Sequence, residues 1–218
     1  HNLHFIVDAA QTAGIMPIDV KESQIDALCF TGHKGLLGPQ GIGGMILTKE
    51  MAQALTPLIA GGTGSFSHLE TMPTNMPDAF ESGTLNLPGI IGLNEGLAFI
   101  ESKGMENIHN HELALTEAFL KGLRPIDGIN IIGKQNVQDR TAVVSITIDG
   151  ADAASVAYEL ESTYHIMTRV GLHCAPRAHQ TLGTYPEGTV RFSFGYANTH
   201  KDVESALSAL HKIVKNTK

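Results

Sequence analysis

Lys34 is the residue whose setting in this sequence first suggests chemistry. It lies in FTGHKGLLGPQGIGG, residues 30–44, at the end of an apolar segment and among several glycines. A lysine amine forms a Schiff base with an aldehyde when the side chain is held in place and partly removed from water. The neighbouring glycines permit a tight turn and a close approach of the backbone to a bound molecule. The same window also fits a solvated lysine on a glycine-rich turn.

Polar side chains around this lysine, and after the apolar run that opens the chain, extend the possible site. Thr31 and His33 offer a hydroxyl and an imidazole suited to an anionic group such as phosphate. Asp8 and Gln11 follow the first apolar run. A carboxylate there could keep a pyridinium nitrogen protonated, and a glutamine could donate to a ring oxygen. Taken by themselves, Asp8 and Gln11 are more simply explained as caps of the following helix.

The segment TRVGLHCAPRAH, residues 168–179, contains a candidate nucleophile. Cys174 follows His173 and precedes an Ala-Pro pair, on a predicted loop before a short helix. A position beside a histidine and near a helix N-terminus is a common setting for a nucleophilic thiolate. Cys174, His173 and His179 also suggest a metal site. Two adjacent ligands and one more do not match the spacing of a closed zinc site, so we predict no metal.

Arg191 lies in GTVRFSFG, residues 188–195, which is otherwise an apolar strand pattern. An arginine in such a strand is costly to bury unless it has a partner. Its planar guanidinium is suited to a bidentate grip on a carboxylate. A structural ion pair would explain the residue equally well.

The elements that must position these residues begin with apolar strands, each followed by polar groups or turns. Two of the polar groups described above follow strands at their C-terminal ends, which suggests an α/β sheet with a site along one edge. A stretch rich in Gly, Pro, Ser and Thr then predicts a long loop of the functional or mobile kind. The strands are predicted at 3–8, 25–30 and 43–48, and the loop at 60–88.

A second α/β domain is predicted after this loop, with the boundary between residues 1–95 and 96–218. Its last helix is expected to start at Thr199, because Asp202 follows in a capping-box spacing. Helices are predicted at 89–102, 105–124, 151–164 and from Thr199 onward, and strands at 129–133, 142–149, 166–171 and 189–195.

Composition limits the classes of partner. The net charge is −7 and there is no long basic run, so nucleic acid and anionic membranes are unsuitable partners. No stretch approaches the roughly 20 apolar residues of a membrane span. The two cysteines, Cys29 and Cys174, do not form a disulfide framework, and we expect a reducing, cytoplasmic setting. The chain opens on HNLHFIVDAA without an initiator Met, so we expect a piece of a longer protein.

Five motifs together resemble the class V aminotransferase superfamily, whose enzymes depend on pyridoxal 5'-phosphate. In chain order they are VDAAQ, TGHKGLLGPQG, FESGT, RVGLHCAP and GTVRFSFGYANT. Within the superfamily they are most similar to the cysteine desulfurase and selenocysteine lyase branch. Each motif alone is a weak signal. Five in order, with a lysine, an upstream Asp and a downstream Cys, are highly specific, and they run through nearly the whole chain.

The resemblance implies a role in cofactor binding for five residues. Lys34 would be the lysine that forms the Schiff base with pyridoxal phosphate. Asp8 would pair with the pyridine nitrogen, and Gln11 would contact the phenolic oxygen of the ring. Thr31 and His33 would bind the phosphate.

The resemblance also implies substrate and partner contacts. Thr84, in FESGT, would reach the phosphate of the other subunit, which implies a homodimer. Arg191 would grip the α-carboxylate of the amino acid, with Arg169 in the same pocket. Cys174 would attack the sulfur of L-cysteine, leaving alanine and a persulfide on the enzyme. A sulfur-acceptor protein is then an expected partner.

The implied fold is α/β, of fold type I among pyridoxal-phosphate enzymes. Residues 1–95 would be the C-terminal part of the large cofactor-binding domain, with a mainly parallel sheet. Residues 96–218 would be the small C-terminal α/β domain. The family's N-terminal part supplies a glycine-threonine phosphate loop and usually a histidine that stacks on the cofactor ring, and this chain lacks it. We therefore expect the isolated chain to bind the cofactor weakly and to have little activity.

Two alternatives stay open. The first keeps the fold and changes the reaction to that of a selenocysteine lyase, an aminotransferase or an epimerase. The second is a non-catalytic truncated fragment, a dimerisation or sulfur-carrier scaffold. Leu172 stands where the family often carries the first of two histidines before the cysteine, so the chain looks more like a less characterised desulfurase-like branch.

Overall fold

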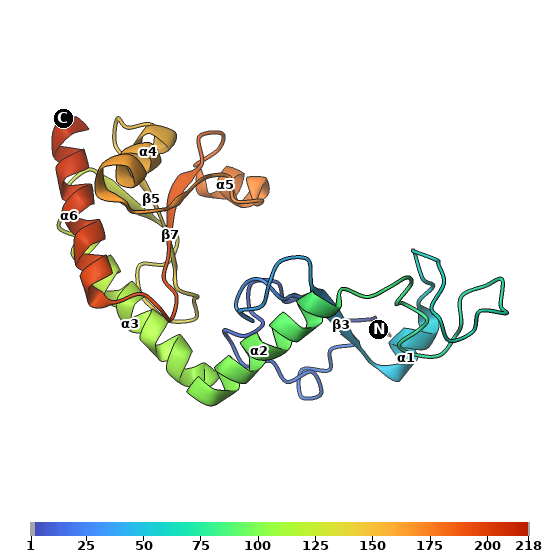
Figure 1. The fold of residues 1–218 in the computed structure, drawn as a ribbon. Helices are drawn as coiled ribbons and strands as arrows, with labels where there is room; N and C mark the ends of the chain where they lie inside the picture. Colours follow the sequence, from blue (N-terminus) through green and yellow to red (C-terminus); the bar gives the residue numbers. More distant parts are fainter. Residues whose placement is uncertain (1–2, 218) are drawn as a thin grey trace. The chain divides into compact units, whose positions relative to one another are not determined.

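The computed structural model describes residues 3–217 and divides the chain into two compact units, His1–Glu106 and Asn107–Lys218 (Figure 1). Residue 95, the domain boundary expected from the sequence, lies inside helix α2 (Leu87–Lys103). Among the described residues, no helix has both the length and the apolar character that a bilayer span requires.

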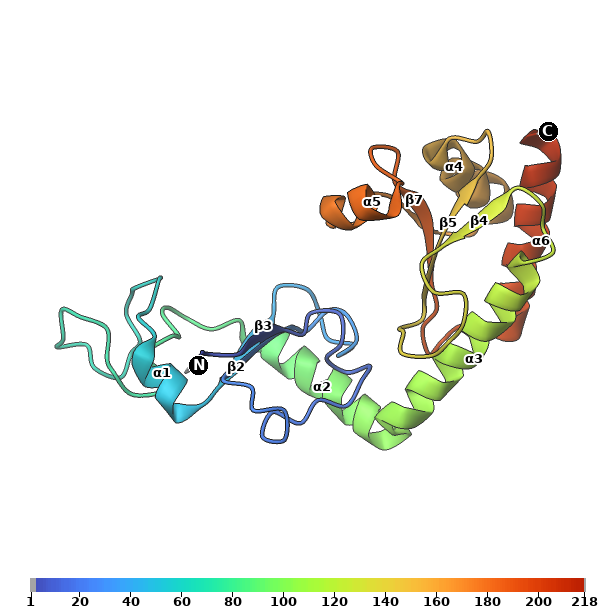
Figure 2. The ribbon, with the colours of Figure 1, turned by 180° about the vertical axis from the view of Figure 1, so that it is seen from behind.

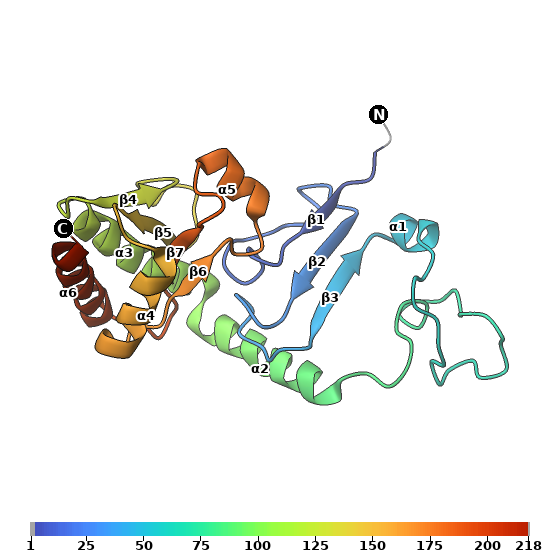
Figure 3. The same cartoon turned by 90° about the horizontal axis from the view of Figure 1, so that it is seen from above.

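The first unit contains a three-stranded sheet in the order β1-β2-β3, which Figure 3 shows side by side. β1 pairs parallel with β2, and β2 pairs antiparallel with β3, so the sheet is mixed. The α/β class predicted from the sequence is confirmed, and the strands lie at the three predicted places. The elements are β1 (Ile6–Asp8), β2 (Ala27–Thr31), β3 (Gly43–Leu47), α1 (Lys49–Ala54) and α2.

Two helix starts in this unit differ from the sequence prediction. Helix α1 was not predicted; Thr48 caps it by accepting a hydrogen bond from Met51 N at 3.2 Å. Helix α2 begins at Leu87, before the predicted residue 89, because Asn86 accepts from the backbone of its first turn. Pro88 is tolerated there because the first turn of a helix needs no backbone donor at that position.

The second unit contains a four-stranded antiparallel sheet in the order β4-β5-β7-β6 (Figure 3). Helices and strands follow the predicted order along the chain. The elements are α3 (Met105–Leu123), β4 (Ile129–Ile132), β5 (Val143–Ile148), α4 (Ala153–Tyr164), β6 (Arg169–Gly171), α5 (Pro176–Leu182), β7 (Thr189–Ser193) and α6 (His200–Thr217).

The core of the second unit lies between one face of this sheet and its long helices. Residues along β5 alternate strictly, so Val144, Ile146 and Ile148 are buried while their neighbours are half-buried. They belong to one cluster with apolar residues of α3, α4 and α6, and α3 and α6 run side by side in Figures 1 and 2. Phe119 of α3 packs on Phe192 of β7, with ring centroids 4.8 Å apart.

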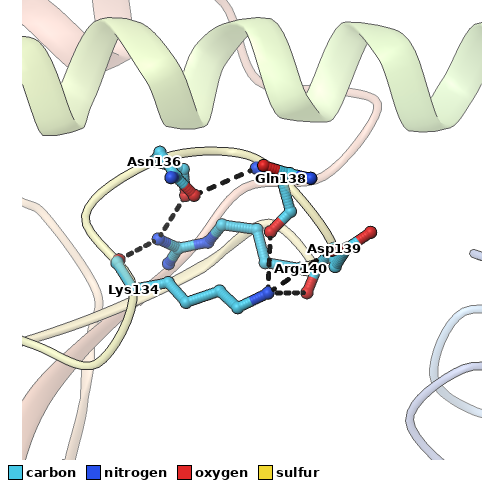
Figure 4. A network of polar contacts seen from close by, with 5 residues as sticks. All are labelled: Lys134, Asn136, Gln138, Asp139 and Arg140. Atoms are coloured by element: carbon cyan, nitrogen blue, oxygen red, sulfur yellow. Dashed lines mark hydrogen bonds and ion pairs between the residues drawn. The ribbon is translucent and has the colours of Figure 1, made fainter.

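The loop between β4 and β5 is held by a half-buried arginine (Figure 4). Arg140 donates to the backbone carbonyls of Lys134 at 2.6 Å and Asn136 at 3.2 Å, and also to those of Thr141 and Val143. Burial lowers the pKa of Arg140. All these acceptors are backbone carbonyls of this loop or of the first residue of β5, so the network has a structural role.

Helix α6 begins where the sequence predicts. The carboxylate of Asp202 accepts hydrogen bonds from Thr199 N at 2.8 Å and Thr199 Oγ1 at 3.0 Å. These bonds lower the pKa of Asp202, because they favour the ionised form. The predicted cap of this helix is confirmed.

Candidate active site

Two chemistry-bearing residues lie at the same edge of the first unit's sheet. Asp8 is the last residue of β1 and pairs with Cys29, and Thr31 ends β2 two positions further on. Because β1 and β2 are parallel, their carboxyl ends meet at one edge, where α/β sheets bind ligands. Oδ1 of Asp8 accepts from Ala10 N at 2.9 Å, so one carboxylate oxygen is used by the local turn.

The Lys34 turn follows at this edge. Thr31 Oγ1 and His33 Nδ1 share a hydrogen bond of 2.8 Å. Lys34 is exposed, and within residues 3–217 its amine forms no hydrogen bond or ion pair. A lysine with no protein partner, next to a hydroxyl and an imidazole, is available to a ligand.

The glycines around Lys34 let two neighbouring segments approach its turn closely. A Cβ on Gly35 would lie 2.5 Å from the carbonyl oxygen of Ala13, in the turn that follows β1. A Cβ on Gly96 of α2 would lie 2.5 Å from the carbonyl oxygen of Leu36. The sequence alone predicts that these glycines allow a bound molecule to approach the backbone. The structure shows that two of these close approaches are to protein backbone.

The other predicted residues of the first unit lie on exposed connections. Gln11 is exposed in the turn after β1, which continues as a turn and not as the helix that the simpler interpretation required. Thr84 is exposed just before α2, next to Gly83, whose φ is +82°. Nearby, Asn86 donates to Gly41 O at 3.1 Å and so joins the start of α2 to the loop that follows Lys34.

The two predicted substrate arginines face each other in the second unit's sheet. Arg169 of β6 and Arg191 of β7 are direct cross-strand partners. Two like charges placed opposite each other are destabilising unless an anion joins them. The Nε atom of Arg191 is buried and has no hydrogen-bond partner in the described chain. Burial, and then the charge of Arg169, lower the pKa of Arg191. Cys174 raises this pKa, so the cysteine lies near the guanidinium.

Cys174 lies in a loop with unusual backbone geometry. His173 and Cys174 have φ values of 50° and 61°, in the left-handed region that non-glycine residues rarely adopt. Nε2 of His173 donates to Arg169 O at 3.2 Å, since a carbonyl oxygen can only accept. Burial lowers the pKa of His173, so its imidazole is neutral near pH 7. The exposed Cys174 therefore sits between a neutral imidazole and the first residues of α5.

Two further residues near this cluster were not predicted from the sequence. Ser145 of β5 is the other cross-strand partner of Arg191, so it shares a sheet face with both arginines. Thr184 pairs with His179, whose buried ring the sequence analysis considered only as a possible metal ligand. The strand register that brings Ser145 to Arg191 has no signal in the sequence. The spacing of His179 and Thr184 could have suggested contact across the end of a short helix.

The structure therefore brings the predicted residues into two groups. Asp8, Thr31, His33 and Lys34 lie at or beyond one strand edge in the first unit, with Gln11 on the adjoining turn. Arg169, Cys174 and Arg191 form the second group in the second unit. Within residues 3–217, no set of three or more His, Cys, Asp or Glu side chains is arranged to hold a metal ion.

Comparison with known proteins decides the family. The model of the aminotransferase class-V family matches residues 1–206. The chain belongs to this family. The predicted resemblance is therefore confirmed, and the relatives that follow lie on its cysteine desulfurase branch.

The alignments with relatives of this class-V family member cover almost all of its chain, but they cover only about half of each relative. A probable cysteine desulfurase of Pyrococcus abyssi is 37% identical over 215 residues, 97% of this chain and 52% of the relative. A probable cysteine desulfurase of Methanothermobacter thermautotrophicus is 34% identical over 96% of this chain and 52% of the relative. The chain thus spans about half the length of the curated relatives it matches.

Solved structures agree. The cysteine desulfurase of Thermococcus onnurineus, in its apo form, has a TM-score of 0.89 at 35% identity over 98% of this chain and 53% of its own. The cysteine desulfurase CsdA of Escherichia coli has a TM-score of 0.86 at 28% identity. The predicted partial fold of a type I pyridoxal-phosphate enzyme is confirmed.

Class-V family members depend on pyridoxal phosphate, and the side chains at the first unit's sheet edge fit this cofactor chemically. They comprise an amine without a partner, a carboxylate with one oxygen free of bonds, and a hydroxyl beside an imidazole. An aldehyde, a pyridine nitrogen and a phosphate require these three kinds of group. The donor set of Lys34, Asp8, Thr31 and His33 could therefore hold the cofactor.

Proposed function

We propose that the protein containing this chain is a pyridoxal-phosphate-dependent cysteine desulfurase, which converts L-cysteine to alanine and leaves a persulfide on Cys174. Names of relatives at 34–37% identity support this activity. The observation that carries the proposal is the buried Nε of Arg191, which has no hydrogen-bond partner among the described residues. It lies opposite Arg169 and close enough to Cys174 for that cysteine to raise the pKa of Arg191. These groups are suited to an amino acid's carboxylate held beside a thiol.

The residues of the first unit are proposed to hold the cofactor. Lys34 Nζ binds its aldehyde and moves protons at the substrate's α-carbon. Asp8 keeps the pyridine nitrogen protonated through the carboxylate oxygen that the local turn leaves free. Gln11 donates to the ring oxygen, and the Thr31–His33 pair binds the phosphate. When bound, pyridoxal phosphate supplies an electron sink for the electron pairs released at the substrate.

The sulfur-transfer step is proposed for the second unit's cysteine. The Cys174 thiolate forms a bond to the sulfur of cysteine, the Cβ–S bond breaks, and its electron pair remains with the substrate carbon. A proton then reaches that carbon and yields alanine, while Cys174 keeps the sulfur as a persulfide. The carboxylate held by Arg191 and Arg169 keeps the substrate sulfur in reach of the thiol.

Further parts of the proposal concern partners and setting. Thr84 is proposed to contact the phosphate bound by the other subunit of a homodimer, and its exposed position before α2 supports contact with a second chain. A thiol-bearing acceptor protein would remove the persulfide sulfur from the exposed Cys174. Both cysteines are free, which supports a reducing, cytoplasmic setting.

The test uses the purified full-length protein. Borohydride reduction followed by peptide mapping is expected to fix the cofactor on Lys34. Cysteine is expected to release alanine and to add one sulfur atom to Cys174, detected by mass spectrometry. Cys174→Ala is expected to abolish sulfur transfer while cofactor absorbance is retained. Alanine release by Cys174→Ala at the wild-type rate would remove the thiol from the mechanism and favour another class-V reaction.

A further inference from the structure

His179 is a buried polar side chain of the second unit that the proposed reaction does not use. It lies on α5 with 7% of its surface exposed, and its Nδ1 shares a 2.7 Å hydrogen bond with Oγ1 of Thr184. A buried polar pair that is satisfied in this way rigidifies its surroundings, since every alternative orientation leaves a polar group without a partner. The imidazole of His179 therefore has one preferred orientation.

Thr184 is in turn fixed by its own backbone. Its N–H donates to His179 O at 2.9 Å, and its carbonyl accepts from Gly188 N at 2.7 Å. Together with the hydroxyl, three groups of Thr184 are held at once. The turn that follows α5 thus acts as a fixed base for the ring of His179.

The ring of His179 contacts the loop that carries the nucleophile. Its centroid lies 5.8 Å from that of His173, with the two ring planes at 36°. His173 is also held by its hydrogen bond to Arg169 O. His173 and Cys174 both have positive φ values, a conformation that persists only where the surroundings enforce it. Helix α5 supplies the ring of His179 that packs against His173 in this pair.

We propose that His179, oriented by Thr184, is a positioning residue that holds the His173–Cys174 backbone in its left-handed conformation and so presents the Cys174 thiol. The contact runs from the turn at Thr184 through the tilted rings of His179 and His173 to the cysteine loop. This inference deepens the proposed function and rests on it for its catalytic meaning. The positioning itself can be measured without that function.

The first experiment measures amide hydrogen exchange in the full-length protein. Ala175 N donates to Leu172 O at 2.8 Å, so the amides of residues 172–175 report on the loop. His179→Leu and Thr184→Val are expected to raise exchange in this segment by about tenfold or more, while β7 stays protected. Thr181→Val is the matched control, because the Thr181 hydroxyl bonds only its own helix at Arg177 O.

The second experiment measures persulfide formation on Cys174 in a single turnover, and the steady-state KM for cysteine alongside it. A loosened nucleophile costs rate without loss of substrate binding, so His179→Leu is expected to be about tenfold slower at unchanged KM. His179→Asn, whose amide can bond Thr184 in place of Nδ1, is expected to recover most of the rate. A residue that only stabilises the unit would not give this recovery together with an unchanged KM.

Each outcome decides the proposal. Wild-type exchange of residues 172–175 in both His179→Leu and Thr184→Val would overturn it. If His179→Leu fails to fold, as judged by thermal unfolding, Thr184→Val and His179→Asn carry the test. If the wild-type protein forms no persulfide, the proposed function fails. Hydrogen exchange then still decides whether His179 positions the loop.

Discussion

At the scale of single residues, Arg191 has surroundings that separate a ligand-binding arginine from a structural one. The sequence left a structural ion pair open. Among residues 3–217, no carboxylate lies within ion-pair distance of Arg191, and its strand neighbours across the sheet are Arg169 and Ser145. A buried guanidinium nitrogen without an acceptor costs free energy unless a ligand supplies one. The absence of a protein acceptor for Arg191 among the described residues therefore favours an anionic ligand at this position.

Substitution of Arg191 tests this interpretation. Arg191→Gln is expected to lower kcat/KM for cysteine on the order of 100-fold, a loss of about 2–4 kcal/mol for a charged carboxylate contact. The loss should appear mainly as a higher KM. Steady-state kinetics of the full-length protein measure it. Arg124→Gln, which changes an exposed arginine bonded to Gln135 O, is the control and should keep wild-type kinetics. Equal kinetics for both variants would contradict the assignment.

At the scale of elements, the glycines show how the Lys34 turn is held. The turn after β1 and helix α2 both approach its backbone at positions where only a hydrogen atom fits. The Lys34 side chain itself is exposed. The packing of the Lys34 turn thus depends on Gly35 beside it and on Gly96, which is far from it in the sequence.

Gly96→Ala is the corresponding prediction. In an exposed helix this change stabilises by about 1 kcal/mol. Here the added Cβ would lie 2.5 Å from Leu36 O, and such overpacking costs about 1–3 kcal/mol. We expect a lower unfolding midpoint in urea and less cofactor reduced onto Lys34. Gly62→Ala, where a Cβ meets nothing within 4 Å, is the control. A stabilised Gly96→Ala variant would show that the contact relaxes freely.

The cap of α6 makes a prediction with a pH dependence. Bonds from Thr199 hold the pKa of Asp202 below its ordinary value of 3.8. A depressed pKa contributes stability above that ordinary value, and the contribution is lost as the pH falls through the folded-state pKa. Asp202→Ala should therefore lower Tm by a few degrees at pH 7, and the difference should narrow below about pH 4. Glu204→Ala, an exposed change in the same helix, is the control. A Tm difference that stays constant down to pH 2 would contradict the carboxylate's role.

The elements themselves were largely predictable, for a local reason. Apolar runs and the 3.6-residue period are properties of short segments, so the strands and the long helices could be assigned from the sequence. Helix α1 was missed because its six residues are too few to show a period. The start of α2 was placed too late because Pro88 was taken as the end of the loop. The mixed character of the first sheet depends on strand direction, which no local pattern shows.

At the scale of the whole molecule, the two units differ in how much core they contain. The second unit has one large buried cluster drawn from three helices and the sheet. The cluster at the first unit's sheet is small and centres on Ala9, Ile25 and Leu28. Large apolar side chains of the first unit are exposed, with Leu3 at 82% and Leu58 at 99%. Burial of apolar surface drives folding, so the second unit is expected to fold on its own more readily than the first.

Excision of the units tests this difference. Residues 105–218 alone are expected to unfold in one cooperative thermal transition, because they contain the large cluster and the complete helix α3. Residues 1–104 alone are expected to aggregate or to bind a hydrophobic dye. Circular dichroism and size-exclusion chromatography measure both. A cooperative transition in the fragment 1–104, with none in 105–218, would reverse the interpretation.

The sequence by itself determined the family, and it predicted which residues could carry the chemistry. Lys34, Asp8, Cys174 and Arg191 stand in motifs that are contiguous along the chain, and motif identity does not depend on folding. Only the tertiary structure decided what surrounds them: the pairing of Arg191 with Arg169, the contact of Thr184 with His179, and the packing of the Lys34 turn by distant glycines. These are relations between segments, set by strand register and by the burial of side chains. Neither is encoded in any one stretch of residues.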